Sequence, residues 1–88
     1  MLKYVTFHKQ ALDDYSNWAI ENKKIFDKIN KLLKIIQRTP YEGEGKPEAL
    51  KYELSGYWSR RITDEDRLVY KVENEQLFIV KCKGHYTN

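Results

Sequence analysis

Three side chains in this 88-residue sequence have the chemistry needed to cleave RNA. RNA carries its own nucleophile, the 2′-hydroxyl, so cleavage requires a base to remove that proton, a cation to stabilise the phosphorane and an acid to protonate the leaving 5′-oxygen. Glu48, Arg67 and His85 fit these roles in that order. On spacing alone the assignment is weak, because such a trio forms a structural ion-pair network about as often as a catalytic site.

Basic side chains are predicted to gather on one face of a sheet. Successive side chains of a strand point to opposite faces, and apolar residues mark the face that helices cover. This rule assigns to the covered face Leu50, Tyr52, Leu54, Trp58, Ile62, Leu68, Tyr70, Val72, Phe78, Val80 and Cys82. The opposite, open face receives Lys51, Glu53, Tyr57, Ser59, Arg61, Thr63, Arg67, Val69, Lys71, Leu77, Ile79, Lys81, Lys83 and His85.

The open face is predicted to bind single-stranded RNA. A cationic surface suits the phosphodiester backbone, and an exposed tyrosine such as Tyr57 can stack on an unpaired base. Lys71 and Lys81 have an ordinary alternative explanation, because antiparallel sheets often keep one solvated face. Lys51, Arg61, Arg67 and His85 come instead from four different strands or strand ends, and we expect them to converge on one site.

Arg60 does not fit this division. It falls between Trp58 and Ile62 on the covered face, where an unpaired charge is costly. A bulge or a salt bridge at the rim of the sheet would remove the conflict.

The spacing of apolar residues predicts the elements that position these side chains. Residues 2–7 read as a short strand, residues 9–21 as a helix, and residues 25–36 as a second helix that Asn22 caps and Thr39-Pro40 ends. After a proline- and glycine-containing loop over residues 40–48, alternation predicts strands at 50–54, 57–63, 67–72 and 76–83. We therefore predict one α+β domain over residues 1–88, with a small antiparallel β-sheet and a two-helix hairpin packed on one face.

Composition excludes several classes of protein. Sixteen Lys and Arg against thirteen Asp and Glu give a net charge of +3, which permits a polyanionic partner without requiring one. The single cysteine excludes an intramolecular disulfide, and Cys82, His8 and His85 lack metal-ligand spacing, so we expect no metal site and no cofactor. The absence of a signal peptide or a long apolar run predicts a cytoplasmic protein without a membrane partner.

Three strings carry a more specific signal: RTPYEGEGKPEALK (38–51), LSGYWSRRITDEDRLVYKV (54–72) and CKGHY (82–86). In this order they closely resemble the YoeB family of toxin–antitoxin ribonucleases, within the RelE-like superfamily. The resemblance covers nearly the whole chain. It implies a compact sheet with two helices on one face, and a toxin that cuts mRNA in the ribosomal A site until a cognate, YefM-like antitoxin masks it.

The resemblance also implies a role for single residues. The general base of the family falls on Glu48, the arginine that stabilises the phosphate on Arg67, the general acid on His85 and a terminal catalytic-site tyrosine on Tyr86. Positions that bind RNA fall on Lys51 and Arg61, and we add Tyr57 and Lys83 from the open face. Two features depart from the family pattern, because Thr87 and Asn88 follow the His-Tyr pair and the flexible Gly84 precedes it.

Two other functions compete with a ribosome-dependent endoribonuclease. A nucleic-acid-binding module without catalysis would use the same cationic face, but it would not need Glu48. A regulatory protein would act only with its antitoxin on operator DNA. The exposed aromatic residues permit a homodimer without specifying one, and neither the codon preference nor the identity of the antitoxin follows from the sequence.

Overall fold

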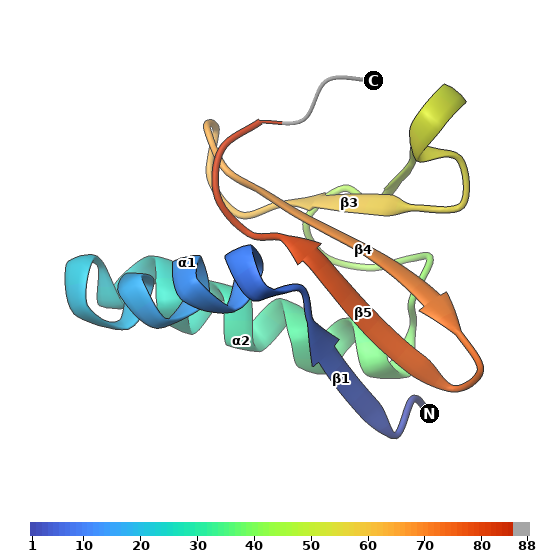
Figure 1. Ribbon diagram of the computed structural model, residues 1–88, viewed down its shortest axis with the longest axis horizontal. Coiled ribbons are helices and arrows are strands. Elements are labelled where there is room, and N and C mark those ends of the chain that lie inside the picture. The colour runs from blue at the N-terminus through green and yellow to red at the C-terminus, as the bar shows by residue number, and fades with distance from the viewer. Residues whose placement is uncertain (86–88) are drawn as a thin grey trace.

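The computed structural model describes residues 1–85 and contains two α-helices and five strands in that range. In chain order these are β1 (Tyr4–Phe7), α1 (Lys9–Glu21), α2 (Lys23–Arg38), β2 (Glu48–Ala49), a 3₁₀ turn η1 (Tyr52–Leu54), β3 (Trp58–Arg61), β4 (Arg67–Glu73) and β5 (Gln76–Lys81). The two helices lie side by side on one face of the sheet (Figure 1). This arrangement confirms the predicted α+β fold, with a two-helix layer packed on a small sheet.

The sheet has the strand order β1-β5-β4-β3-β2. Strands β2 to β5 form the predicted antiparallel meander. Strand β1 adds a parallel pair by aligning Val5 with Leu77 of β5, so the complete sheet is mixed. Between β1 and β5 the chain passes first through both helices and then through β2, β3 and β4.

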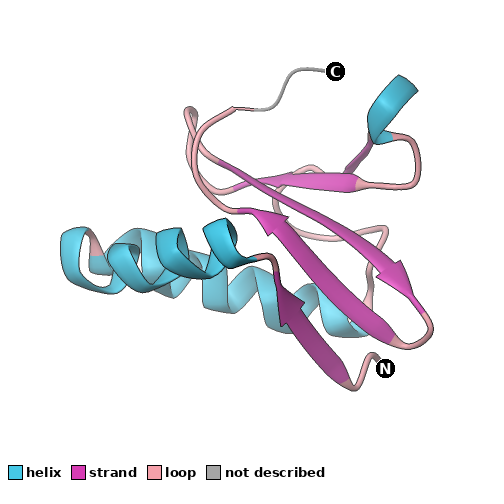
Figure 2. Cartoon of the chain, in the orientation of Figure 1, coloured by secondary structure: helices cyan, strands magenta, loops and turns pink. Residues whose placement is uncertain are grey.

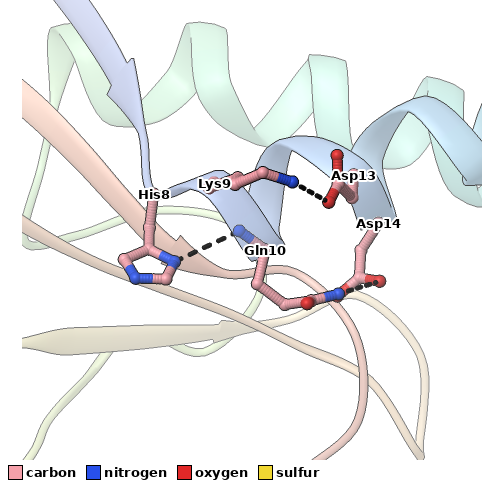
Figure 3. A network of polar contacts seen from close by, with 5 residues as sticks. All are labelled: His8, Lys9, Gln10, Asp13 and Asp14. Atoms are coloured by element: carbon pink, nitrogen blue, oxygen red, sulfur yellow. Dashed lines mark hydrogen bonds and ion pairs between the residues drawn. The ribbon is translucent and has the colours of Figure 1, made fainter.

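Side-chain caps fix the boundaries of the helices. Asn22 ends α1 by donating its backbone N–H to the carbonyl of Trp18, and it begins α2 by accepting the N–H of Ile25 on its side-chain oxygen. At the other end of α1, Nδ1 of His8 accepts the N–H of Gln10 at 3.2 Å (Figure 3). His8 is therefore a helix cap, and its imidazole lies outside the predicted catalytic face.

The core lies between α2 and the covered face of the sheet. Ile29, Leu32 and Ile36 of α2 are fully buried, as are Leu68 and Tyr70 of β4. Complete burial of such a side chain contributes roughly 1.5–3 kcal/mol of stability.

Within residues 1–85 no helix is long and apolar enough to cross a membrane.

The segment predicted as a strand over residues 50–54 is different in the structure. Strand β2 covers only Glu48–Ala49, and the chain then turns through η1, where Tyr52 has a positive φ of 55°. Tyr52 is 81% exposed and Leu54 only half-buried, so both predictions of a core position were wrong. Alternation cannot continue through a 3₁₀ turn, because its side chains do not point alternately to two faces.

A bulge reverses the predicted faces in the first half of β5. Val69 pairs with Lys81 while Tyr70 pairs with Ile79, so Val80 is an extra residue on β5. Leu77 and Ile79 are consequently buried in the core, and Phe78 and Val80 are half-buried. The assignment of these four residues was therefore wrong. Beyond the bulge, Lys81 and Cys82 have the predicted parity.

Candidate active site

The open face is organised in rows that the strand register defines. Glu48 pairs with Ser59, Ser59 with Val69, and Val69 with Lys81, so one row crosses four strands. Arg61 pairs with Arg67 in the next row. Residues on one face of paired strands that are offset by two positions lie roughly 7–8 Å apart, which places Arg61 diagonally beside Glu48. The register thus brings the predicted base and two predicted cations onto one face.

Glu48 is exposed and follows a loop, residues 39–47, that packs against β3. The carbonyl of Gly45 accepts the N–H of Arg61 at 2.7 Å, which docks the loop onto the strand. Gly45 has a φ of +90°, and a Cβ there would lie 3.1 Å from the Cβ of Arg60 and 3.2 Å from the Arg61 carbonyl. Only glycine suits this approach.

Arg60 holds the same loop from inside the protein. It is fully buried, and its guanidinium donates to the carbonyls of Thr39 (2.7 Å), Glu42 (2.9 Å) and Glu44 (2.9 Å) and to the Tyr70 hydroxyl (3.1 Å). Neither a bulge at Arg60 nor a salt bridge explains its position, so both expected explanations were wrong. Hydrogen bonds to main-chain carbonyls replace its water, as burial of a charge requires.

Arg67 is half-buried, and among residues 1–85 only Nη1 of its guanidinium has a hydrogen-bond partner. Nη1 donates to the carbonyls of Thr63 (2.8 Å), Asp64 (3.2 Å) and Asp66 (3.2 Å) in the turn before β4. Among residues 1–85, Nε and Nη2 have no protein partner. A guanidinium fixed at one corner offers its remaining edge for two parallel hydrogen bonds to a phosphate.

Arg61 and Arg67 stand directly opposite each other on neighbouring strands. Like charges in such a pair are destabilising. Within the described part of the chain neither arginine forms an ion pair. The pair therefore concentrates positive charge at a point where an anion would be stabilised.

His85 follows a segment that returns to the turn between β3 and β4, as the ribbon shows after β5 (Figure 2). The N–H of Arg67 donates to the carbonyl of Gly84 at 3.0 Å, and the N–H of Gly84 donates to Oδ1 of Asp66 at 2.8 Å. Gly84 is therefore bonded to both Arg67 and Asp66, and the exposed His85 is the next residue along the chain. Gly84 was expected to add backbone freedom, but its two hydrogen bonds hold it in place.

The other predicted residues are distributed more widely. Lys51 is exposed at the start of η1, and Tyr57 lies on the open face with Lys71 Nζ 5.4 Å from its ring centre. Nζ of Lys83 lies 5.5 Å from the ring centre of Trp18 in α1, which directs this lysine toward the helix layer. Tyr86 lies outside the described residues.

Two further polar groups bear on the chemistry of the site. Burial raises the pKa of the Cys82 thiol to about 12, with smaller contributions from Asp14 and Asp66, so Cys82 is no nucleophile at neutral pH. Sequence reasoning missed the contact between Asp66 and Gly84. The spacing Thr63-x-x-Asp66 was a usable signal, because threonine and aspartate side chains commonly bond to the backbone of their own turn.

Two helices on one face of a five-stranded mixed sheet form the fold of RelE-like toxins. Residues 7–86 match the model of a family described as the YoeB-like toxin of bacterial type II toxin–antitoxin systems. The chain belongs to this family, and it is a toxin of a type II toxin–antitoxin system.

Similar proteins cover nearly the whole chain. Toxin YoeB of Escherichia coli K12 is 54% identical over 78 residues, which are 89% of this chain and 93% of that protein. The toxin in a YoeB-YefM complex from Staphylococcus aureus is 50% identical with a TM-score of 0.89, and the match covers 98% of this chain and 99% of that one. A YoeB dimer from the same organism is 48% identical with a TM-score of 0.90, covering 98% and 100%.

Proposed function

We propose that this toxin is a ribosome-dependent endoribonuclease that cleaves mRNA in the A site and so inhibits translation. The observation that carries the proposal is the register of the open face. It aligns Glu48 with Ser59 and Arg61 with Arg67 on the face that no helix covers, while Gly84 is bonded to the main chain of Arg67. The proposed base and the two arginines thus lie on one face, and Gly84, which is bonded to Arg67, directly precedes the proposed acid.

The reaction needs no cofactor, because RNA supplies the nucleophile. Glu48 takes the 2′-OH proton, O2′ attacks the adjacent phosphorus, and the bond from phosphorus to the 5′-oxygen breaks. Arg67 binds the non-bridging oxygens, whose charge grows in the transition state. His85 gives its proton to the departing 5′-oxygen, and Tyr86 assists beside it. The products are a 2′,3′-cyclic phosphate and a 5′-hydroxyl.

Replacing the proposed base tests the reaction and also separates the enzyme from a binding module. Glu48→Gln and Arg67→Ala should each reduce cleavage on programmed ribosomes by roughly 10²- to 10⁴-fold, measured by primer extension. Glu53→Gln is the matched control, because Glu53 is exposed in η1 and its loss changes the net charge equally. Glu48→Gln should not weaken binding, since it removes a negative charge. Full cleavage by Glu48→Gln would refute the role of Glu48 as the base, and a wild type that does not cleave would refute the proposed function.

The partners follow from the charge of the same face. We propose that the toxin acts in the cytoplasm on ribosome and mRNA, that a YefM-like antitoxin covers Arg61 and Arg67 with an acidic or extended segment, and that operator DNA is bound only through the toxin–antitoxin complex. A homodimer, as in the YoeB relative, is compatible with this use of the open face. A complex that left both arginines exposed would refute masking of the site.

Salt dependence measures the phosphate contacts. Each contact to single-stranded RNA changes the slope of log affinity against log salt by about −0.7. Arg61→Gln should therefore flatten the slope by about that amount. Lys34→Gln removes the same charge from the exposed side of α2 and should leave the slope unchanged. If the affinity of the wild type for RNA does not change with the salt concentration, the open face does not bind the phosphodiester backbone.

A further inference from the structure

The turn between β3 and β4 contacts both charged parts of the proposed site. Its carbonyls at Thr63, Asp64 and Asp66 accept Nη1 of Arg67. Its Asp66 side chain accepts the N–H of Gly84, the residue before His85. One short segment of the chain therefore holds the phosphate-binding guanidinium and the segment that carries the acid.

The Asp66 carboxylate is itself oriented on both of its oxygens. Oδ1 accepts the Gly84 N–H at 2.8 Å and Oδ2 accepts the Thr63 hydroxyl at 2.8 Å. The Thr63 oxygen in turn accepts the N–H groups of Glu65 (3.1 Å) and Asp66 (3.0 Å). A side chain with both oxygens bonded has little freedom to rotate, so the position of Gly84 is fixed by the turn.

The backbone at Gly84 makes this contact decisive for the direction of the tail. Gly84, three residues after the end of β5, has a φ of +76°, and its carbonyl accepts the Arg67 N–H at 3.0 Å. The N–H of Gly84 is held only by Asp66 among residues 1–85. Without that bond the peptide can rotate about the remaining anchor, and His85 moves with it.

From this geometry we infer that Asp66 is a positioning residue for His85: its carboxylate fixes Gly84 and thereby sets the position of His85 relative to the phosphate site proposed at Arg67. This inference rests on the proposed function. A displacement of about 1 Å in a reacting group can lower a rate by roughly 10²-fold. Loss of the Asp66 contact should therefore reduce cleavage, although Asp66 touches no substrate.

Three replacements of Asp66 separate geometry from charge, each measured as a single-turnover rate on programmed ribosomes. Asp66→Ala should lower the rate by roughly 10- to 100-fold. Asp66→Asn keeps an oxygen that can accept the Gly84 N–H but loses the acceptor for the Thr63 hydroxyl, so it should retain clearly more activity than Asp66→Ala. Asp66→Glu keeps the charge but moves the oxygens by one methylene, and it should lose more activity than Asp66→Asn. The reverse order, with Asp66→Glu active and Asp66→Asn inactive, would overturn the inference.

A double-mutant cycle identifies the group through which Asp66 acts. In a His85→Gln background, Asp66→Ala should change the residual rate by no more than a few-fold, because the group that it positions is absent. An additive loss of 10- to 100-fold in that background would show a different role and overturn the inference. Asp66→Glu serves in the cycle if Asp66→Ala is unfolded at the assay temperature, which thermal melts decide. Glu65→Gln, next to Asp66 and exposed, is the charge control.

The same set of variants distinguishes the inference from the function on which it rests. If the wild type does not cleave mRNA on programmed ribosomes, the proposed function fails, and if Glu48→Gln and His85→Gln both cleave at the wild-type rate, the proposed catalytic roles fail. If those two are inactive and Asp66→Ala is fully active, only the role of Asp66 fails.

Discussion

Glu48 and His85 stand at the ends of two segments that are fixed in different ways. The loop before Glu48, residues 39–47, binds a buried guanidinium through three of its carbonyls and docks Gly45 onto β3. The chain before His85 is anchored in the core at Cys82, whose carbonyl accepts Nε1–H of Trp18 at 2.9 Å. Beyond Cys82 it is held by two hydrogen bonds at Gly84, one of them to the half-buried carboxylate of Asp66. The first segment is anchored to a buried side chain, whereas the last residues of the second are attached to the surface of a turn.

This difference assigns different physical tasks to the two segments. Disrupting the loop exposes or leaves unpaired several buried polar groups, so its position is coupled to folding. Releasing the tail removes few buried contacts, so its position affects the reaction more than the stability. We expect mutations around Glu48 to lower stability and activity together, and mutations around His85 to lower activity alone.

Shortening the tail should give the largest effect. Deleting residues 85–88 removes the proposed acid and should reduce cleavage by roughly 10²- to 10⁴-fold with little change in the thermal melt. Deleting residues 87–88 alone should preserve most activity, because threonine and asparagine have no group that titrates near neutral pH. Cleavage by the longer deletion at the wild-type rate would disprove the assignment of His85. A folded but inactive shorter deletion would show that Thr87 and Asn88 position the site.

Replacing Arg60 should produce the largest loss of stability. Arg60→Met leaves three loop carbonyls and the Tyr70 hydroxyl without their donor, and we expect the free energy of unfolding in urea to fall by about 3–5 kcal/mol. The neighbouring Arg61→Met is the matched control, because Arg61 is exposed and faces Arg67. Its stability should change by less than about 0.5 kcal/mol. Equal losses in the two variants would contradict an internal role for Arg60.

The sequence predicted the helices more successfully than the faces of the strands. Asn22 and Thr39-Pro40 are local signals, and both helices end where these residues stand. The bulge at Val80 has no local signal, because residues 77–80 are all apolar and either parity gives an apolar face. The face that carries Arg61 and Arg67 was still obtained, since it depends on β3 and β4 alone. The catalytic roles themselves stay predictions.

The hydrogen-bond partners of Arg60 could not be predicted from the sequence, for a different reason. Its partners are main-chain carbonyls of Thr39, Glu42 and Glu44, and every residue of the chain offers such a carbonyl in the same way. Only the path of the folded loop brings three of them to one guanidinium. The pattern showed that a charge at Arg60 conflicts with the covered face. The carbonyls that bind its guanidinium could be identified only in the folded structure.

Removing the Tyr70 hydroxyl should have an intermediate effect. This group donates to the Pro40 carbonyl at 2.6 Å and accepts from Arg60, so Tyr70→Phe should lower the free energy of unfolding by about 1–2 kcal/mol. Desolvation raises the pKa of Tyr70, and the hydrogen bond from Arg60 opposes part of that rise. A raised folded-state pKa means that the contribution is complete below about pH 10 and is lost as the pH rises further.

Urea unfolding at pH 8 and above pH 10 tests whether the contribution of the Tyr70 hydroxyl to stability is lost as the pH rises. The stability difference between wild type and Tyr70→Phe should shrink at the higher pH. Tyr4→Phe, in the exposed strand β1, is the control for a hydroxyl that contacts nothing in the described residues. A difference that widens with pH would mean that Tyr70 is ionised more readily in the folded protein, contrary to its burial.

The smallest effect is expected at Glu44, where the loop meets α2 on the outside. Its carboxylate pairs with Lys28 and, at 3.1 Å, with Lys31, and the hydrogen bonds from these lysines lower the pKa of Glu44. A lowered folded-state pKa gives a contribution that is present above about pH 4.5 and is lost as the pH falls through the folded value. Glu44→Gln should therefore reduce the melting temperature slightly at pH 7, and this difference should shrink as the pH falls below about 4.5. The effect should also weaken in high salt, because the pair is partly exposed. If Glu44→Gln matched Arg60→Met in its loss of stability, the loop would be held mainly from its surface, and the contrast between a buried anchor and a surface anchor would fail.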